Sequence, residues 1–394
     1  MQRLKVKLVK IVLVSNYFNH HQKPFCDEMY RELGADFAFI STSEMREERK
    51  KLGYGLGQIP AYVFLSYEND RKKEEALSLI EAADVVIAGS APNRMLLKRI
   101  RSGKLLLRYS ERPFKRRISC LKRLYYSVAF RIRDLNRKNV HMLCAGAYVA
   151  GDYASVGMYK GRAYQWGYFP QVKEYDIDAL LAVKKPDTIL WCGRFIDWKH
   201  PDVAIVIARR LKEAGYDFHL NMVGTGVMEA ELKKQAEDMG LNDVVHFQGS
   251  MPPERVREYM EEAGIYLFTS DRQEGWGAVL NESMNSGCAV VASDAIGSVP
   301  YLLEDDVNGM IYETGNADML YEKVRRLLDH PEEQFRMGRA AYKTMIEEWS
   351  AAVAVNRLLK LMDRLLSRGN FHDLFERGPC CRCNTAKNHG AEDA

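Results

Sequence analysis

The stretch F-T-S-D-R-Q-E-G-W-G-A-V-L-N-E-S-M-N-S-G-C-A-V-V, residues 268–291, decides how this chain is interpreted. It predicts the end of a buried strand, a glycine-punctuated turn, a short helix that begins near Trp276 or Gly277, and the next strand. Glu274 lies in the turn, and Glu282 follows eight positions later in the early turns of the helix. A helix N-terminus after a strand offers free N–H groups to a phosphate. Two carboxylates beside it can hold hydroxyl groups of a sugar and of a ribose, which is our starting hypothesis.

The 394-residue chain is long enough for two domains, each with its own core. Its net charge of +4 is small and indicates no class of partner by itself. The eight cysteines are too few and too scattered for a disulfide framework, and they suit a reducing compartment. Lysines interrupt residues 1–14, which therefore lack the apolar region of a signal peptide, and no run approaches the ~20 apolar residues of a membrane span. We predict a cytoplasmic protein.

Strands and helices alternate along two long segments. In the first segment the predicted strands are 6–14, 36–40, 62–65, 84–89, 104–109 and 141–146. In the second they are 188–193, 218–224, 244–247, 265–268 and 288–292. Such alternation implies right-handed crossovers and parallel sheets covered on both faces, so the predicted class is α/β with two doubly wound, Rossmann-like domains. A ligand is expected in a cleft at the carboxyl ends of the strands.

The domain boundaries follow from changes in composition. We predict an N-terminal domain over 1–168 and a C-terminal domain over 169–349, with a linker at 168–187 that includes a short helix near 178–183. A helix at about 350–366 is expected to pack back on the first domain. The polar, Gly-rich segment 367–394 is predicted to be disordered.

Two turns of the second domain carry groups suited to a phosphate. G-R-F-I-D-W-K, residues 193–199, places Arg194 and Lys199 on one loop after a strand. A diphosphate leaving group gains negative charge as its bond to a sugar breaks, and an Arg fork with a Lys point charge can replace a metal ion there. The alternative is a solvated loop with two surface cations. In a later V-G-T-G turn, Gly224 and Gly226 permit close approach to a phosphate or a base, although a plain strand–helix turn explains them equally well.

Together these motifs resemble the retaining glycosyltransferases of family 4, which have the GT-B fold of two facing Rossmann-like domains with a cleft between them. The matching elements occur in the family's order: G-R-x-x-x-x-K at 193–199, V-G-x-G at 223–226, E-G-W-G-x-x-x-x-E at 274–282 and S-G-C-A-V-V-A-S at 286–293. The resemblance is strong over about 185–330. Over the first domain it rests on architecture alone.

The resemblance implies a role for individual residues. Arg194 and Lys199 match the cations that hold the nucleotide diphosphate, Glu274 matches the carboxylate that contacts donor-sugar hydroxyls, and Glu282 matches the one that binds the ribose. The other donor-binding candidates are Gly193, Gly224, Gly226, Gly275, Trp276 and Gly277, the last three through their backbone. The family uses a nucleotide-sugar, here a UDP- or GDP-sugar, and transfers the sugar with retention of configuration and without a bound metal or other cofactor. The C-terminal domain would then hold the donor and the N-terminal domain the acceptor.

The chain departs from the family's pattern mainly on the acceptor side. Tyr301 stands where a Glu is common, and the first loop, S-N-Y-F-N-H-H-Q, is not Gly-rich. His20 and His21 on that loop are candidates for contact with the acceptor or for its deprotonation, with an ordinary surface loop as the alternative. Ser110 and Glu111 follow a strand where the family often has a His; either one takes that role, or the role is absent.

Two further motifs have simpler structural explanations. D-I-D at 176–178 resembles the metal-binding D-x-D of other glycosyltransferases, but it falls in the predicted linker, and we interpret it as charge at a helix start. C-C-R-C at 380–383 has no second cysteine pair at zinc-site distance, so we assign it to the disordered tail. No metal site is predicted.

Residues 112–138 contain ten Lys or Arg and a single acid, Asp134. Apolar residues recur between the cations at helical spacing: Ile118, Leu121, Tyr125, Val128, Ile132 and Leu135. This basic amphipathic helix suits an anionic membrane surface, as a lipid-linked acceptor would require. The alternative is a domain helix with its apolar face in the core. No groove-reading or base-stacking module accompanies the segment, so no nucleic acid is expected.

The sequence thus predicts a retaining, metal-independent hexosyltransferase that acts at the inner face of the cell membrane in cell-surface polysaccharide synthesis. One alternative is a non-catalytic glycosyltransferase-like subunit that binds a nucleotide-sugar or a partner enzyme. Another is a nucleotide-sugar epimerase or dehydrogenase, although the chain lacks a complete G-x-G-x-x-G after its first strand. The base, the sugar, the acceptor and the oligomeric state stay open.

Overall fold

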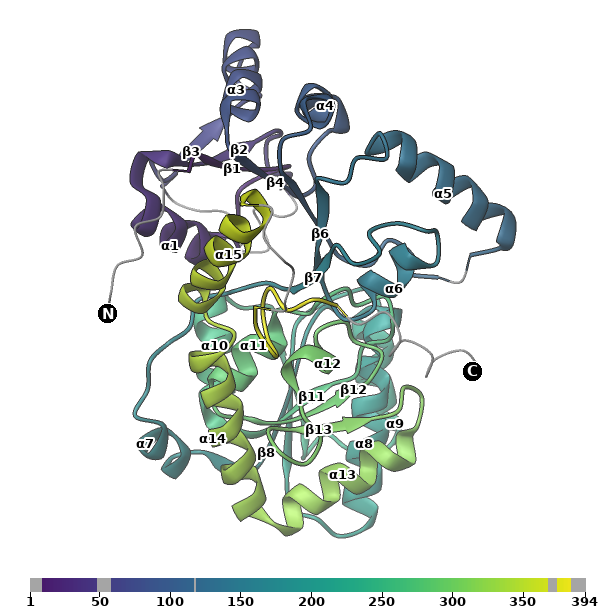
Figure 1. Ribbon diagram of the computed structural model, residues 1–394. Coiled ribbons are helices and arrows are strands. Elements are labelled where there is room, and N and C mark those ends of the chain that lie inside the picture. Colours follow the sequence, from purple (N-terminus) through teal and green to yellow (C-terminus); the bar gives the residue numbers. More distant parts are fainter. Residues whose placement is uncertain (1–8, 48–57, 117, 368–373, 384–394) are drawn as a thin grey trace. The chain divides into compact units, whose positions relative to one another are not determined.

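The structure, a computed structural model, describes residues 9–47, 58–116, 118–367 and 374–383 (Figure 1). The described chain clusters into two compact units, one from residues 1–170 and 351–394 and the other from residues 171–350. Each unit contains one sheet whose neighbouring strands are parallel and are joined by helices. The predicted α/β class with two doubly wound, Rossmann-like domains is therefore confirmed.

The first unit is built on a seven-stranded sheet with the order β3-β2-β1-β4-β5-β6-β7. Its strands are β1 Ile11–Ser15, β2 Phe37–Ser41, β3 Val63–Leu65, β4 Val85–Ala88, β5 Leu106–Ser110, β6 Val140–Ala145 and β7 Ala163–Trp166. β1, β4 and β6 are buried along their whole length, as continuous apolar runs of central parallel strands are. The chain moves outward from β1 to β3 and then returns to β4, so the strand order reverses between β1 and β4.

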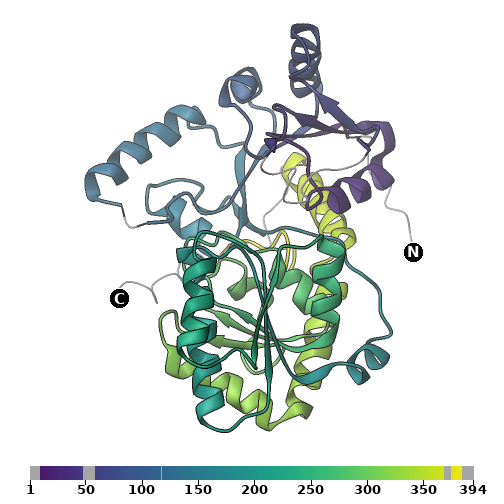
Figure 2. The ribbon, with the colours of Figure 1, turned by 180° about the vertical axis from the view of Figure 1, so that it is seen from behind.

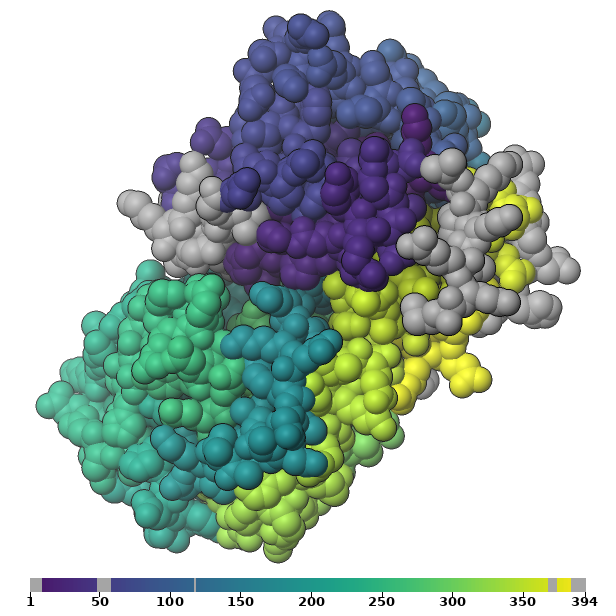
Figure 3. Space-filling view, turned by 90° about the vertical axis from the view of Figure 1, so that its left-hand side faces the viewer, coloured from purple at the N-terminus to yellow at the C-terminus, as the bar shows by residue number. Residues whose placement is uncertain are grey.

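Helices cover this sheet on both faces. They are α1 Lys23–Leu33, η1 Gly34–Asp36, α3 Asp70–Ala82, α4 Asn93–Ser102, α5 Cys120–Arg133, α6 Val149–Ala154 and α15 Ala351–Leu366. A proline in its first turn starts α1, and Gly34 ends it with a positive φ of 55°. α15 comes from the far end of the chain and packs along α1 (Figures 1 and 3).

The second unit has a six-stranded sheet with the order β10-β9-β8-β11-β12-β13. Its strands are β8 Lys185–Cys192, β9 His219–Val223, β10 Val245–Gly249, β11 Ala263–Phe268, β12 Ala289–Ser293 and β13 Met310–Tyr312. Its helices are α7 Ile177–Ala182, η3 Asp197–Lys199, α8 Pro201–Glu213, α9 Glu229–Asp238, α10 Pro253–Glu262, α11 Val279–Asn285, α12 Val299–Leu302, α13 Ala317–Asp329 and α14 Pro331–Glu347. The order reverses between β8 and β11, which makes that edge the topological switch point. Figure 2 shows the sheet of this unit from behind.

Every predicted strand overlaps an observed one, but β7 and β13 were not predicted. Each is a short edge strand, of four residues in β7 and three in β13. The segment predicted as a linker between the domains does not connect them freely, because its residues pack on the second unit. The backbone N–H of Lys173 donates to Asn285 Oδ1 at 2.9 Å, and β8 begins at Lys185 rather than at residue 188.

The D-I-D motif lies at the start of α7. The side chain of Asp176 accepts a hydrogen bond from the backbone N–H of Ala179 at 3.2 Å and so caps the helix, while Asp178 pairs with Arg339. Both carboxylates therefore serve the local structure.

The expected disorder of 367–394 is wrong for residues 374–383, while 368–373 and 384–394 lie outside the described residues. Cys380 and Cys383 donate backbone hydrogen bonds to Gln165 and Ala163, and Gln165 donates one to Cys381, so this segment pairs with the edge strand β7. Cys380 and Cys381 are each 3% exposed. The composition is polar, but edge-strand pairing supplies the backbone hydrogen bonds that a tail otherwise takes from water.

Candidate active site

Two loops leave the carboxyl ends of β8 and β11 side by side at the switch point of the second unit. Several hydrogen bonds join them. The Thr269 hydroxyl donates to the carbonyl oxygen of Lys199 at 2.7 Å, and the Asp271 N–H donates to that of Trp198 at 3.0 Å. The indole N–H of Trp191, at the end of β8, donates to the Thr269 oxygen at 2.8 Å. The two loops therefore form one connected structure.

An ion pair links the same loops. Lys199 Nζ lies 2.5 Å from Glu274 Oε2, and the side chains are 12% and 13% exposed. The Ser270 hydroxyl donates to the same carboxylate oxygen at 3.2 Å. The ammonium group also lies 4.9 Å from the centre of the Trp198 ring. The fold thus brings together two predicted site residues, 75 positions apart in the chain, and holds their charged groups where water reaches them poorly.

Arg194 lies exposed on the loop after β8. Its guanidinium carbon is 5.8 Å from the centre of the same Trp198 ring that Lys199 approaches. Trp198 therefore supports both predicted cations of the loop. Sequence reasoning missed this residue and Thr269, because neither a lone tryptophan nor a lone threonine carries a signal without its neighbours in space.

Glu282 lies in the first turn of α11, which begins at Val279, two or three residues later than predicted. Its side chain is half-buried, and burial raises its pKa to about 6, with Arg257 opposing the shift. Burial raises the pKa of Cys192 to about 12, with Glu282 raising it further and Lys199 lowering it. The charges of Glu282 and Lys199 therefore both influence Cys192 at the carboxyl end of β8.

The glycines of the site are required by backbone packing. A Cβ on Gly224, whose φ is +140°, would lie 1.8 Å from the carbonyl oxygen of Gly193, and one on Gly226 would lie 2.3 Å from that of Phe195. Gly193 in turn donates its N–H to Val223 at 2.9 Å. Close contact between the loops after β8 and β9 explains these glycines fully. Their part in binding a donor stays a prediction.

Gly277 has a φ of +81°, and a Cβ there would meet the Phe268 ring at 2.3 Å. Gly275 beside it is buried. The turn between β11 and α11 can therefore close only over glycine, as the two-glycine pattern indicated.

The Trp276 side chain is buried and is not accessible to a donor. Its indole ring is fully buried, donates to Asn281 Oδ1 at 2.8 Å, and packs 5.6 Å from Trp349. Tyr301, the departure from the family's common Glu, stacks on the same Trp349 ring at 6.0 Å. The Trp276 side chain thus belongs to the core, which leaves the prediction for residues 275–277, made for their backbone, as it was.

The predicted acceptor residues lie in the first unit at the carboxyl ends of β1 and β5. The His20 and His21 rings are 3.9 Å apart, and burial together with His20 lowers the pKa of His21 to about 3, which makes it neutral at physiological pH. His21 also stacks on Tyr168, with ring centres 6.4 Å apart. The Tyr168 hydroxyl donates to the Glu111 carboxylate at 2.5 Å.

Ser110 turns away from this group, because its hydroxyl donates to the backbone oxygen of Glu111 at 2.6 Å. Tyr168 therefore connects His21 with Glu111, and sequence reasoning missed it. It follows an edge strand that the sequence did not reveal.

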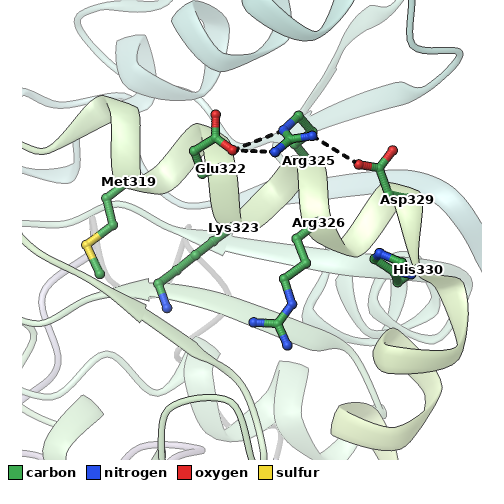
Figure 4. A pocket seen from close by; sticks show the side chains of 7 residues that line it. All are labelled: Met319, Glu322, Lys323, Arg325, Arg326, Asp329 and His330. Atoms are coloured by element: carbon green, nitrogen blue, oxygen red, sulfur yellow. Dashed lines mark hydrogen bonds and ion pairs between the residues drawn. The ribbon is translucent and has the colours of Figure 1, made fainter.

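A hollow of about 440 Å³ lies elsewhere in the second unit, along α13 (Figure 4). Its lining residues are Met319, Glu322, Lys323, Arg325, Arg326, Asp329 and His330. Arg325 pairs with Glu322 and Asp329, and Arg326 pairs with Asp306 and Glu333. None of the predicted site residues lines it, and its Lys and Arg side chains are paired with carboxylates, so we assign it no part in the reaction.

The described residues contain neither a helix that could span a membrane nor a cluster that could hold a metal ion. None of the described helices is long and apolar enough to cross a membrane. Within the same residues, no cluster of three or more His, Cys, Asp or Glu side chains is placed to hold a metal ion.

Residues 172–344, nearly the whole second unit, match the family model of the glycosyl transferases group 1. Among curated proteins, the amylovoran biosynthesis glycosyltransferase AmsK of Erwinia amylovora is 32% identical over 189 residues, 47% of this chain and 46% of AmsK. The chain thus spans about half the length of this curated relative.

Solved structures match both units. HepE of Anabaena, solved in complex with UDP, has a TM-score of 0.65 at 16% identity and covers 89% of this chain and 98% of HepE. The lipopolysaccharide outer core galactosyltransferase WaaB has a TM-score of 0.63 at 15% identity and covers 91% of this chain and 99% of WaaB. These matches establish the GT-B fold, as predicted.

Proposed function

We propose that this chain is a group 1 glycosyltransferase and, more narrowly, a retaining, metal-independent hexosyltransferase of family 4. It would move a hexose from a nucleotide-diphosphate sugar to a glycan or lipid-linked acceptor in cell-surface polysaccharide synthesis. The ion pair of Lys199 with Glu274, at the switch point of the family-matching unit, carries the proposal.

The two charged groups suit the two parts of a donor. When the bond between the sugar carbon and the diphosphate oxygen breaks, its electron pair stays on the diphosphate, whose charge the Lys199 ammonium and the Arg194 guanidinium stabilise. Glu274 accepts hydrogen bonds from sugar hydroxyls. Because it is paired with Lys199, the group that contacts the sugar and the group that contacts the diphosphate stay at a fixed distance from each other. Glu282 accepts hydrogen bonds from the ribose.

Two relatives support the choice of substrates. HepE has been solved with UDP-glucose, and AmsK is named for the synthesis of amylovoran. We therefore expect a UDP-sugar ahead of a GDP-sugar, and a glycan of the cell surface as the product. We assign the acceptor contacts to His20, His21 and Glu111 of the first unit, with Ser110 as a backbone-supporting neighbour.

The first experiment is a thermal shift panel of UDP- and GDP-sugars on the whole protein. A true donor stabilises the folded state according to its occupancy, by about 2.7 kcal/mol at a hundred times its Kd. The matching donor is then tested for hydrolysis and for transfer to lipid extracts. Stabilisation by no nucleotide-sugar would refute the proposal. Donor binding without any hydrolysis or transfer would favour the alternative of a non-catalytic, nucleotide-sugar-binding subunit, in line with the departures at Tyr301 and in the first loop.

A further inference from the structure

The outer face of α5 is an exposed apolar stripe. Its side chains are Leu121 at 81% exposure, Leu124 at 65%, Tyr125 at 67%, Val128 at 48% and Ile132 at 67%. With about 100° between successive residues, all five fall within an arc of about 100° on one side of the helix. No residue of α5 is fully buried. The alternative that the apolar face of this helix joins the core is therefore wrong for this stripe.

The inner face of α5 is held by other residues. Tyr126 and Phe130 pack with Phe114 and Tyr153, with ring centres 5.0 to 5.6 Å apart. The stripe is therefore a second apolar face, separate from the one that packs on the unit.

The helix is also anchored at its C-terminal end. Asp134, 1% exposed, accepts hydrogen bonds from Arg108 of β5 at 2.6 Å and from the Tyr159 hydroxyl, and it pairs with Arg133 at 3.2 Å. Such a network fixes the direction of α5 relative to the sheet. In Figures 1 and 2, α5 lies at the margin of the first unit, with no other helix or strand of that unit on its outer side.

Exposed cations surround the stripe. Arg116, Lys122, Arg123 and Arg131 are exposed, and Lys115 is exposed but pairs with Glu111 at 3.5 Å. The single acid of the segment, Asp134, is buried and neutralised. By helical position, Lys122 and Arg131 flank the stripe on opposite sides. An apolar face with cations on both flanks matches the anionic headgroups and acyl chains of a lipid surface.

We propose that the outer face of α5 docks the protein on an anionic lipid bilayer, with Leu121, Leu124, Tyr125 and Ile132 entering the headgroup–acyl boundary. The cations beside the stripe favour an anionic bilayer over a second copy of the chain, because two copies would bring like cations together without exposed acids to match them. The inference goes beyond the proposed function and does not rest on it, because vesicle binding requires neither donor nor acceptor.

The test is sedimentation of the whole protein with phosphatidylcholine vesicles that contain about 30% phosphatidylglycerol or none. The key variant is Leu121→Gln/Leu124→Gln/Ile132→Gln, which keeps good helix formers and touches no buried side chain. The matched control is Ile59→Gln/Val183→Gln/Val307→Gln, three aliphatic residues that are 52%, 69% and 44% exposed elsewhere. Circular dichroism checks that both variants are folded.

We expect the wild type and the control to bind anionic vesicles and the key variant to bind at least about tenfold more weakly. Lys122→Gln/Arg131→Gln should weaken binding by about tenfold or more, and salt should weaken wild-type binding. Wild-type binding to neutral vesicles as strong as to anionic ones would overturn the proposal, as would equal binding by the key variant. A wild-type dimer that the key variant abolishes, without vesicle binding, would assign the face to a second copy instead.

Discussion

Replacing Lys199 with Met keeps most of the side chain's apolar length and removes the ammonium group 2.5 Å from Glu274. The Glu274 carboxylate then loses its cation where it is only 13% exposed. Breaking a fully buried pair costs about 3–5 kcal/mol, and breaking an exposed pair costs about 0–1 kcal/mol. The hydrogen bond from Ser270 remains. We therefore expect the second unit to lose roughly 2–3 kcal/mol of unfolding free energy.

A double-mutant cycle isolates the pair. Glu274→Gln alone should destabilise the unit because it leaves the ammonium unpaired, and Lys199→Met/Glu274→Gln should be more stable than the sum of the single changes predicts, by about 1–2 kcal/mol. The assay is urea unfolding followed by tryptophan fluorescence. Four of the five tryptophans, Trp191, Trp198, Trp276 and Trp349, belong to the second unit, so the signal reports mainly on that unit.

The same variants separate the two proposed roles. Lys199→Met should weaken UDP binding by about tenfold to a hundredfold, since a charge-assisted contact to phosphate is lost. Glu274→Gln should bind UDP as the wild type does but should lose transfer, because only the sugar contact changes. Calorimetric titration with UDP gives the comparison. Additive destabilisation in the cycle, or equal loss of UDP binding in both variants, would refute the reasoning.

Three further changes have defined outcomes. Burial raises the pKa of Glu282 from 4.5 to about 6, so the ionised carboxylate lowers the free energy of unfolding above pH 6, and this cost vanishes below about pH 4.5. Glu282→Gln should therefore stabilise the unit by up to about 2 kcal/mol near pH 8 and should be neutral near pH 4. Melting temperatures measured across this pH range check the prediction. Gly224→Ala should lower the free energy of unfolding by more than about 3 kcal/mol. Gly240→Ala, with φ +65° and no atom within 4 Å of the added Cβ, should lower it by about 1 kcal/mol. Equal losses for the two variants in urea unfolding would contradict the packing argument. Truncation after Ser367 should give a melting temperature roughly 5 °C lower than truncation after Cys383, because it also removes the segment 380–383 whose backbone hydrogen-bonds with β7.

The order of elements was accessible from the sequence because it depends on local pattern. Apolar runs predicted the central strands β1, β4, β8 and β11, and their alternation with helices predicted parallel sheets. The structure then located the switch point in each sheet. The short edge strands β7 and β13 were missed, although β3, an edge strand of three residues, was predicted. Pairing with a neighbour contributes more to such strands than their own pattern does. The pairing of residues 374–383 with β7 was missed together with it.

By itself, the sequence determined the α/β class with two doubly wound domains, because the alternation of strands and helices is a local property. The GT-B fold and the candidate donor residues Arg194, Lys199, Glu274 and Glu282 were implied by the resemblance of its motifs to a family. Only the tertiary structure decided what each side chain touches. In the structure, Lys199 forms an ion pair with Glu274, 75 positions away in the chain, and the Trp276 ring is buried in the core. α5 has an exposed apolar face in addition to the face that packs on the first unit. These outcomes depend on which surfaces meet in three dimensions, and residue spacing along the chain does not contain that information.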